Sequence, residues 1–379
     1  MALRVGVVID PWDYPYNGTV VSTRRFVNAL SERIEFRLLA TPHPEMAQDQ
    51  RLFPFPKLTI PGVNGIIEGM RVPLANPWGK ADVAASLQGL DLVHMQFPFF
   101  LGAKVCREAK KLGIPLICSF HVQPENLLRN LGLKSPLLSR LLYKIFIWGL
   151  YRHADLVLTP SEFAAQQLRD HGLRQPIEVL SNGVPEKFFE LQKCPHGSEK
   201  FSILSVGRMA PEKHQELIFQ AVTRSKHKNN IQLRLIGTGP LEEKLRTLAD
   251  SMDIHVELGT ATDDELSSAY ASADLFVHAG EVELEGMSVL EAMAAGNAVL
   301  VSDSDNSASV EFVRDKNALF SSLSASDLAM KIDYWIESDQ ERRRAGEANR
   351  QVAKARHHET SVHQLREIYR RFHGRGADK

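Results

Sequence analysis

The chain has 379 residues, of which 44% are hydrophobic and 24% are charged, and its formal net charge is −1. This length is comfortable for two domains, and the balanced charge gives no global attraction to nucleic acid. The three cysteines, Cys106, Cys118 and Cys194, are scattered without a CxxC pair. The sequence therefore predicts neither a disulfide framework nor a zinc site.

The beginning of the chain goes directly into a strand-like run and lacks the apolar region and cleavage site of a signal peptide. No apolar stretch reaches the roughly 20 uncharged residues of a transmembrane helix. We therefore expect a cytoplasmic protein, and leave open a peripheral position on the inner face of the membrane.

Short apolar runs alternate with amphipathic stretches in the first half of the chain, a pattern typical of a doubly wound α/β sheet. Strands are predicted at residues 4–9, 35–40, 90–95, 115–119, 155–159 and 177–180. Helices are predicted at residues 19–31, 102–112 and 161–172, and somewhere within 124–152. Residues 54–78 are rich in Pro and Gly and are interpreted as an irregular or partly strand-like insertion.

A polar, aperiodic stretch at residues 184–200 is interpreted as a linker between a first domain, residues 1–183, and a second domain, residues 201–355. The second domain repeats the alternation, with strands predicted at residues 201–206, 233–236, 256–259, 273–277 and 298–301. Helices are predicted at residues 311–314, 326–338 and 340–372, and residues 374–379 are expected to be frayed.

Residues 278–297 contain an acidic, glycine-marked loop that runs into a short apolar helix beginning near Met287 or Ser288. Ligands of open parallel sheets collect at the carboxyl ends of strands, where this loop lies. The first N–H groups of the helix lack intrahelical partners, so a phosphate could bind there. Glu283 and Glu291 could accept hydrogen bonds from one elongated polyhydroxyl ligand. Alternatively, the loop is merely solvated and Glu291 interacts with the helix dipole.

Arg208 and Lys213 are the cations nearest a strand end in the second domain. Arginine offers a planar fork to phosphate and lysine a mobile point charge, so together they could neutralise a diphosphate. The alternative is an ordinary basic surface. The turn from Gly237 to Pro240 is only a partial GxGxxG, with Glu242 in place of the third glycine, so a dinucleotide site is weakly indicated.

Two residues of the first domain are further candidates. Gly18 could bring the backbone close to a ligand because it has no Cβ, although Asn17-Gly18 also fits an ordinary turn. His121 falls at the carboxyl end of a predicted strand, although a lone histidine is usually structural.

Residues 126–154 contain no acidic residue and many apolar ones, including Trp148. Their basic residues are Arg129, Lys134, Arg140, Lys144 and Arg152. A basic amphipathic helix of this kind is typical of an element that dips into an anionic membrane surface. The alternative is a core helix with a basic exposed face, in a segment that Pro136 interrupts.

The spacing Glu283-x7-Glu291, followed by Ala292-Met293-Ala294-x-Gly296, resembles the signature of the retaining glycosyltransferases of family 4. The resemblance covers nearly the whole chain and is strongest in the second domain. It implies the α/β GT-B fold, with two Rossmann-like doubly wound domains facing a cleft. It also implies that the C-terminal helix, residues 356–379, packs back on the first domain.

The resemblance also implies roles for the candidate residues. Glu283 would contact the donor sugar and Glu291 the ribose, while Arg208 and Lys213 would hold the diphosphate. His121 would lie beside the reactive end of the sugar. The remaining positions expected to line the nucleotide sugar are Gly18, Gly207, Gly237, Leu258, Gly286, Met287 and Ser288. Glu285 replaces an aromatic or small residue of the family, which bears on the sugar accepted.

The activity implied is transfer of a hexose from a nucleoside diphosphate sugar, with a UDP-sugar favoured and with no metal or other cofactor. The string at residues 121–126, His-Val-Gln-Pro-Glu-Asn, resembles diacylglycerol glucosyltransferases and related capsule or glycolipid enzymes. A lipid acceptor is therefore favoured over a soluble glycan or sugar phosphate. A nucleotide-sugar epimerase of the same fold and an inactive binding module remain alternatives. Nothing in the sequence indicates the oligomeric state.

Overall fold

The computed structural model describes residues 2–12, 17–41, 49–57, 83–194, 200–252 and 254–373. It divides into two compact units, of which the first consists of Met1–Leu128, Lys134–Asn182 and Thr360–Lys379. The second consists of Arg129–Leu133 and Gly183–Glu359. Residues 58–78 of the predicted insertion, residues 195–199 of the predicted linker and the predicted frayed end at 374–379 lie outside the described residues.

Within the described residues, the first unit contains a seven-stranded parallel sheet in the order β3-β2-β1-β4-β5-β6-β7. The strands are β1 (Leu3–Val8), β2 (Ile34–Ala40), β3 (Leu52–Pro54), β4 (Leu92–Met95), β5 (Leu116–Ser119), β6 (Leu156–Thr159) and β7 (Ile177–Val179). The six strands predicted for this part of the chain are confirmed to within two residues at either end, and β3 is the strand that the sequence pattern missed.

The helices of the first unit follow the predicted alternation. Among the described residues they are α1 (Gly18–Leu30), α3 (Val83–Leu87), α4 (Phe100–Lys111), most of α5 (Pro124–Asn130), α6 (Pro136–Gly149), the 3-10 turn η2 (Tyr151–His153), α7 (Glu162–Asp170) and most of α15 (His358–Phe372). Pro136 begins α6 rather than breaking a helix, because it occupies the first turn and Ser135 caps the backbone. Asn17 likewise caps α1, so Asn17-Gly18 begins a helix and is not a turn.

The second unit contains a six-stranded parallel sheet in the order β10-β9-β8-β11-β12-β13, counted over the described residues. The strands are β8 (Phe201–Val206), β9 (Ile231–Ile236), β10 (Val256–Gly259), β11 (Leu275–His278), β12 (Ala298–Asp303) and β13 (Leu319–Ser321). The helices are α8 (Glu186–Phe189), α9 (Gln215–Arg224), α10 (Glu242–Ser251), α11 (Asp263–Ser272), α12 (Met287–Ala294), α13 (Ala325–Glu337) and α14 (Asp339–Lys354).

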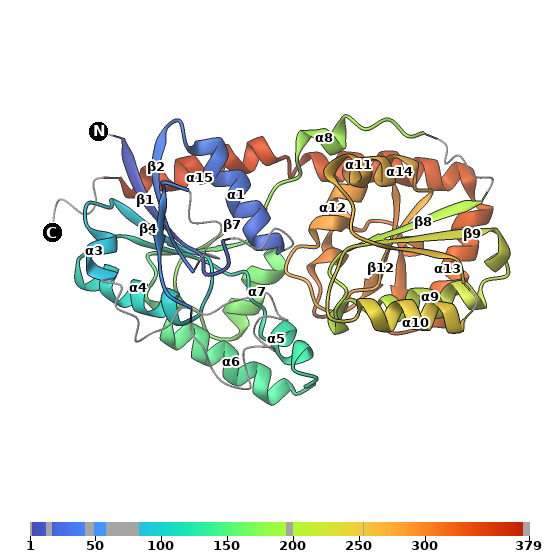
Figure 1. The fold of residues 1–379 in the computed structure, drawn as a ribbon, viewed down its shortest axis with the longest axis horizontal. Coiled ribbons are helices and arrows are strands. Elements are labelled where there is room, and N and C mark those ends of the chain that lie inside the picture. Colours follow the sequence, from blue (N-terminus) through green and yellow to red (C-terminus); the bar gives the residue numbers. More distant parts are fainter. Residues whose placement is uncertain are drawn as a thin grey trace. The chain divides into compact units, whose positions relative to one another are not determined.

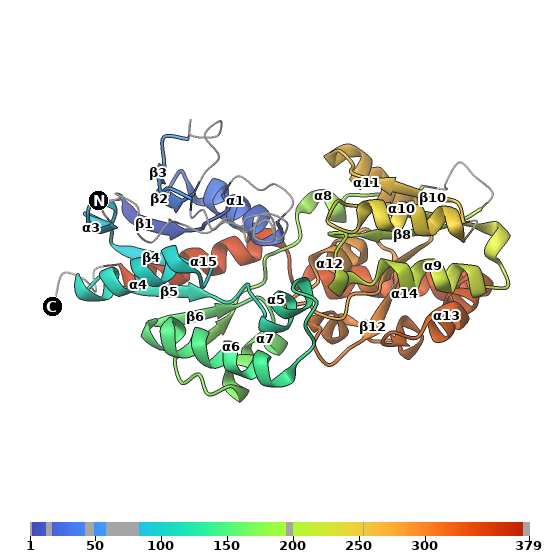
Figure 2. The ribbon, with the colours of Figure 1, turned by 60° about the horizontal axis from the view of Figure 1, so that its bottom comes forward.

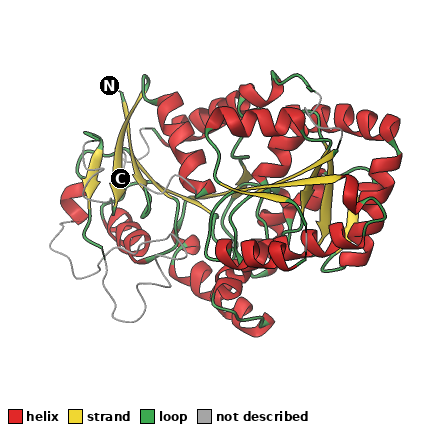
Figure 3. Ribbon diagram, turned by 45° about the vertical axis from the view of Figure 1, so that its right-hand side comes forward, coloured by secondary structure: helices red, strands yellow, loops and turns green. Residues whose placement is uncertain are grey.

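Both faces of the second sheet are covered by helices, as the near-continuous apolar strands require. One buried cluster joins the sheet to α9, α10 and α13, and another joins it to α8, α11, α12 and α14. Figure 1 shows α9 and α10 on one side of the strands and α11 and α14 on the other, and Figure 3 shows the same layers by secondary structure.

Two predicted helices are wrong in their limits, and the predicted linker contains the short helix α8. The single helix predicted at residues 340–372 is divided into α14 and α15. Between them the backbone turns to pair with Val184, whose N–H donates to Arg356 O and whose carbonyl accepts from the N–H of His358. These groups therefore cannot continue the helical ladder. The helix predicted at 311–314 is a 3-10 turn at Ala308–Phe312.

Helix α14 packs closely on the second sheet at Gly346. A Cβ atom added to Gly346 would collide with the carbonyl oxygen of Gly296, which follows α12. The missing side chain lets the backbones approach, which explains a glycine in the middle of a helix.

We expect Gly346→Ala to lower the free energy of unfolding by about 1–3 kcal/mol, because overpacking outweighs the roughly 1 kcal/mol by which alanine favours a helix. Gly149→Ala is the matched control, since a Cβ there meets nothing within 4 Å. Calorimetry should show a lower unfolding temperature for Gly346→Ala alone. Equal unfolding temperatures for the two variants would contradict this packing.

Candidate functional site

The candidate site of the second unit lies at the carboxyl ends of β8 and β11. These neighbouring strands are where the strand order of the sheet reverses, the usual ligand position in a doubly wound fold. β8 leads into Gly207 and Arg208, and β11 leads through the acidic loop into α12.

The acidic loop is held by its own backbone. The N–H of Glu281 donates to Glu212 O over 2.9 Å, and the N–H of Glu283 donates to Asn306 O over 3.2 Å. The carbonyl of Glu283 in turn accepts from the N–H of Ala308 over 2.9 Å. These bonds fix the loop to two other segments, so the backbone of Glu283 is held in place by the protein itself.

Glu283 is ionised in this site. Its Oε1 accepts a hydrogen bond from Lys213 Nζ, and His278 Nε2 lies 3.2 Å from the same oxygen. Burial raises the pKa of Glu283, but the charges of Lys213 and His278 outweigh burial and lower it to about 2. The structure thus brings together the predicted residues Lys213 and Glu283, which are 70 positions apart in the sequence.

The helix that follows begins as predicted at Met287. Gly286 precedes it in the left-handed conformation, with φ of 78°, and a Cβ there would collide with Ser309 Oγ. Met287 and Ser288 are half-buried in the first turn and precede Val289, whose N–H donates to Gly286 O over 3.0 Å. N–H groups at the very start of a helix have no partner within it. The first turn therefore offers the hydrogen-bond donors that an anion requires.

Glu291 lies one turn further along α12 and is 8% exposed. The hydroxyl of Tyr270, a buried residue of α11, lies 3.2 Å from Glu291 Oε2. This contact from α11 holds the Glu291 carboxylate in its orientation.

Arg208 is held by an acidic partner of its own. Its guanidinium donates to Glu212 over 3.2 Å and to Asn130 Oδ1, and Glu212 is 1% exposed. The two predicted cations are thus bound by different carboxylates, Arg208 by Glu212 and Lys213 by Glu283.

The predicted glycines of this edge have a packing reason. The N–H of Gly207 donates to Ile236 O over 2.9 Å, and a Cβ at Gly237 would collide with the carbonyl oxygen of Gly207. The two strand-end turns therefore touch backbone to backbone. Leu258 lies on β10 beside Leu235, and its carbonyl accepts from Arg246 over 3.3 Å. Roles for these residues in nucleotide binding stay predictions.

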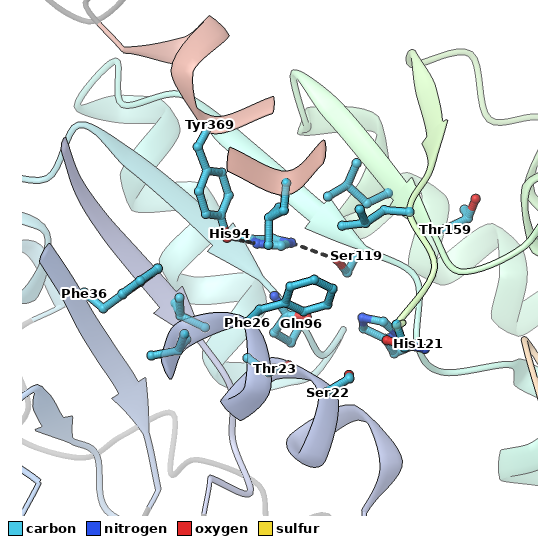
Figure 4. Close-up of a pocket in the computed structure, with 16 residues that line it drawn as sticks. Ser22, Thr23, Phe26, Phe36, His94, Gln96, Ser119, His121, Thr159 and Tyr369 are labelled. Atoms are coloured by element: carbon cyan, nitrogen blue, oxygen red, sulfur yellow. Dashed lines mark hydrogen bonds between the residues drawn. The ribbon is translucent and has the colours of Figure 1, made fainter. Parts of the chain in front are cut away.

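His121 and Gly18 belong to the first unit. Gly18 is exposed at the start of α1. His121 lines a small cavity of about 20 Å³ with His94, Ser119 and Tyr369 (Figure 4), which is room for roughly one water molecule. Burial lowers the pKa of His121 to about 4, so its imidazole is neutral at neutral pH. The predicted role of His121 in catalysis stays a prediction.

His94 joins the C-terminal helix to the first sheet in the same cavity. Its Nδ1 lies 2.6 Å from the hydroxyl of Tyr369 on α15, and its Nε2 lies 2.8 Å from Ser119 Oγ (Figure 4). Burial and then the nearby His121 lower the pKa of His94 to about 3. A neutral imidazole donates from one nitrogen and accepts at the other, and hydroxyl groups satisfy both.

Several titratable groups near the site are absent from the sequence-based prediction, among them Glu212, which holds Arg208. His278 ends β11, which is the criterion that selected His121, so the same reasoning could have found it. Glu281 accepts two hydrogen bonds from Arg129, of 3.0 and 2.8 Å, and lies 3.3 Å from His214 Nε2. Burial lowers the pKa of His214, but Glu216 and Glu281 together raise it by more than burial lowers it, so the pKa lies above its ordinary value.

Glu285, the position that departs from the family pattern, is 3% exposed. Burial lowers the pKa of Arg356, and the charge of Glu285 partly offsets this shift. Glu285 thus has a charged neighbour within the protein. Its expected influence on the accepted sugar stays a prediction.

Comparisons with known proteins agree with this arrangement. A family model described as Glycosyltransferase Family 4 matches residues 16–188, and one described as Glycosyl transferases group 1 matches residues 186–352. The GDP-mannose-dependent alpha-mannosyltransferase of Corynebacterium glutamicum is 28% identical over 306 residues, which are 78% of this chain and 71% of that protein. The alpha-monoglucosyldiacylglycerol synthase of Streptococcus pneumoniae is 26% identical over 239 residues, 59% of this chain but only 54% of that protein.

Among solved structures, sucrose-phosphate synthase from Thermosynechococcus elongatus aligns over 97% of this chain and 98% of its own. The TM-score is 0.77 at 16% identity, so the likeness concerns the fold, and the predicted GT-B fold is confirmed. Because the two family models together match residues 16–352, the chain is a glycosyltransferase and belongs to glycosyltransferase family 4.

Proposed function

We propose that this glycosyltransferase transfers a hexose from a nucleoside diphosphate sugar to a lipid acceptor, with retention of the anomeric configuration. The observation that supports the donor part of this proposal is the partly buried Lys213–Glu283 pair at the carboxyl edge of the second sheet. A fixed carboxylate, a cation and the open first turn of α12 lie on neighbouring strand-end segments there. A nucleoside diphosphate sugar has matching groups in its hydroxyls and its diphosphate.

In this proposal Arg208, Lys213 and the N–H groups of Met287 and Ser288 stabilise the negative charge that develops on the leaving diphosphate. Glu283 accepts hydrogen bonds from hydroxyls of the sugar, and Glu291 accepts them from the ribose. The positive charges of Arg208 and Lys213 serve in place of a divalent cation, so the proposal needs no metal. The loop bonds to Asn306 and Ala308 support it, because a fixed acceptor costs little reorganisation during the reaction.

The proposed retention follows from same-face attack assisted by the leaving phosphate. Glu283 already accepts a hydrogen bond from Lys213, and this makes its carboxylate a weak nucleophile. A UDP-sugar is the favoured donor. A GDP-sugar is the alternative, since one relative is named a GDP-mannose-dependent enzyme.

The lipid acceptor is supported by helix α6. Its inner side is anchored, because Ser139 Oγ donates to Glu125 and the hydroxyl of Tyr143 donates to Glu125 over 3.2 Å. Its outer side carries large apolar side chains that are 41–77% exposed: Leu137, Leu138, Leu141, Ile145 and Trp148. Figure 2 shows this helix at the periphery of the first unit.

Four of these exposed side chains, at positions 137, 141, 145 and 148, recur at helical spacing and form one stripe. Such a stripe beside basic residues suits the surface of an anionic membrane, here proposed as the cytoplasmic face. The relative named a monoglucosyldiacylglycerol synthase supports diacylglycerol or a glycolipid as the acceptor. Among the described residues, no helix is long and apolar enough to cross a bilayer.

We expect Arg208→Ala and Lys213→Ala each to lower kcat by roughly 100- to 1,000-fold, the usual effect of removing a group that stabilises developing charge. The measurement is sugar transfer from UDP-glucose and GDP-mannose to diacylglycerol in mixed micelles. Lys228→Ala, an exposed cation of the same unit, is the control and should match the wild type. Full activity in the two site variants would refute the assignment, and transfer only to soluble sugars would refute the lipid acceptor.

The stability that Glu283 provides should depend on pH. Its folded-state pKa of about 2 lies below its ordinary value, so its stabilising effect is complete above about pH 4.3 and is lost as the pH falls toward 2. Glu283→Gln should therefore be less stable than the wild type near neutral pH, by at most roughly 3 kcal/mol. Calorimetry should show this difference narrowing in acid. If the difference in the free energy of unfolding stayed constant with pH, this would contradict the ion pair. Glu243 is exposed, so Glu243→Gln is the control and should unfold like the wild type at every pH.

We expect the double substitution Leu137→Ser and Leu141→Ser to weaken binding to phosphatidylglycerol vesicles by roughly 100-fold or more, since each buried leucine contributes about 1.5–3 kcal/mol. The unfolding temperature should not fall, because both side chains are exposed. Met330→Ser removes an exposed apolar side chain of α13 and is the control for vesicle sedimentation. Unchanged binding in the double variant would exclude α6 as the membrane contact.

A further inference from the structure

A concavity of about 720 Å³ lies beside the exposed stripe of α6, between that helix, η2 and the turn after α7. Three cations from these three elements line it: Lys144 from α6, Arg152 from η2, and Arg174 from the turn. No carboxylate of the described residues lines it. The concavity is therefore positive on several sides, unlike a single basic helix face.

The three cations have no acidic partner among the described residues, since none of the salt bridges there includes Lys144, Arg152 or Arg174. Elsewhere in the chain, arginine side chains such as Arg371 and Arg129 are paired with carboxylates. Charges left unpaired in a shared hollow attract an anion more strongly than the same charges spread over a surface.

The walls of the concavity are fixed by local contacts. The guanidinium of Arg152 stacks over the Trp148 indole at 4.2 Å from its centroid, and Gln175 Nε2 donates to Arg152 O over 2.5 Å. His171 stacks on Tyr143 at a centroid distance of 3.8 Å, which ties the turn after α7 to the inner side of α6. The three elements are thus held together by local contacts, and Arg152 is held directly, while Lys144 and Arg174 are exposed side chains of the same concavity.

We propose that this concavity binds the phosphate of an anionic phospholipid headgroup. The inference rests on the proposed membrane docking through α6 and adds a specific headgroup site to it. Trp148 is 68% exposed and belongs both to the stripe and to the concavity, so a lipid whose tails lie along the stripe places its headgroup at the cations. Arginine forks and a lysine ammonium suit phosphate oxygens, with which they form charge-assisted hydrogen bonds.

The test uses the full chain and two sets of phosphatidylcholine vesicles with equal surface potential, one charged with phosphatidylglycerol and the other with oleate. Diffuse electrostatic attraction depends on the surface potential and not on the headgroup. We expect the wild type to bind the phosphatidylglycerol vesicles more tightly by roughly tenfold or more, the value of a charge-assisted hydrogen bond. Arg174→Ser should abolish this preference.

Arg140→Ser is the matched control, because Arg140 is an exposed cation of α6 that does not line the concavity. It removes the same charge and should keep the preference for phosphatidylglycerol. Equal behaviour of the two variants, or no preference in the wild type, would overturn the headgroup site. Protection of the wild type from thermal unfolding by free glycerol phosphate as strong as that by vesicles would also overturn a lipid site.

Sugar transfer to a micellar acceptor without charged lipid separates this inference from the proposed function. Arg174→Ser should retain that transfer, because Arg174 belongs to the first unit and not to the candidate donor site. Loss of the lipid preference with transfer retained supports the headgroup site. Absence of wild-type transfer would instead count against the proposed acceptor.

Discussion

A carboxylate that is largely withdrawn from water needs a cation, and in this protein that constraint organises the candidate site of the second unit. Glu283 remains charged because Lys213 and His278 compensate for the water that burial removes. Lys213 comes from the turn after β8, and Glu283 and His278 come from the loop and strand at β11. The pair therefore joins the two strands at which the sheet reverses its order, so the electrostatics and the topology select the same place.

The sequence predicted most of the fold because its apolar runs are short and alternate regularly with amphipathic stretches. Its failures occurred where contacts between distant segments decide the local structure. The pairing of Val184 with Arg356 and His358 interrupts a pattern that is otherwise uniformly helical and charged. β3 and β13, the two strands that no predicted strand matches among the described residues, are each only three residues long, too short for a periodicity to stand out.

For the candidate site, the sequence identified residue types at strand ends but not their partners. Glu283 and Glu291 could be selected by their spacing, whereas the links of Glu283 to Lys213 and of Glu281 to Arg129 span 70 and 152 positions. These long-range pairings depend on how the sheet brings its turns together, which local patterns do not encode. The pairing of Arg208 with Glu212 is different, because the two residues are four positions apart in one short turn.

The contact of His94 with Tyr369 has a consequence for how the chain can be divided. A protein cut after residue 182 would contain all seven strands described for the first sheet but would lack α15. His94 Nδ1 and the apolar surface under Leu365 would then lose their partners. A hybrid enzyme that exchanges the first domain between relatives should therefore carry the matching C-terminal helix with it. The first sheet and helix α15 therefore have to come from the same parent protein.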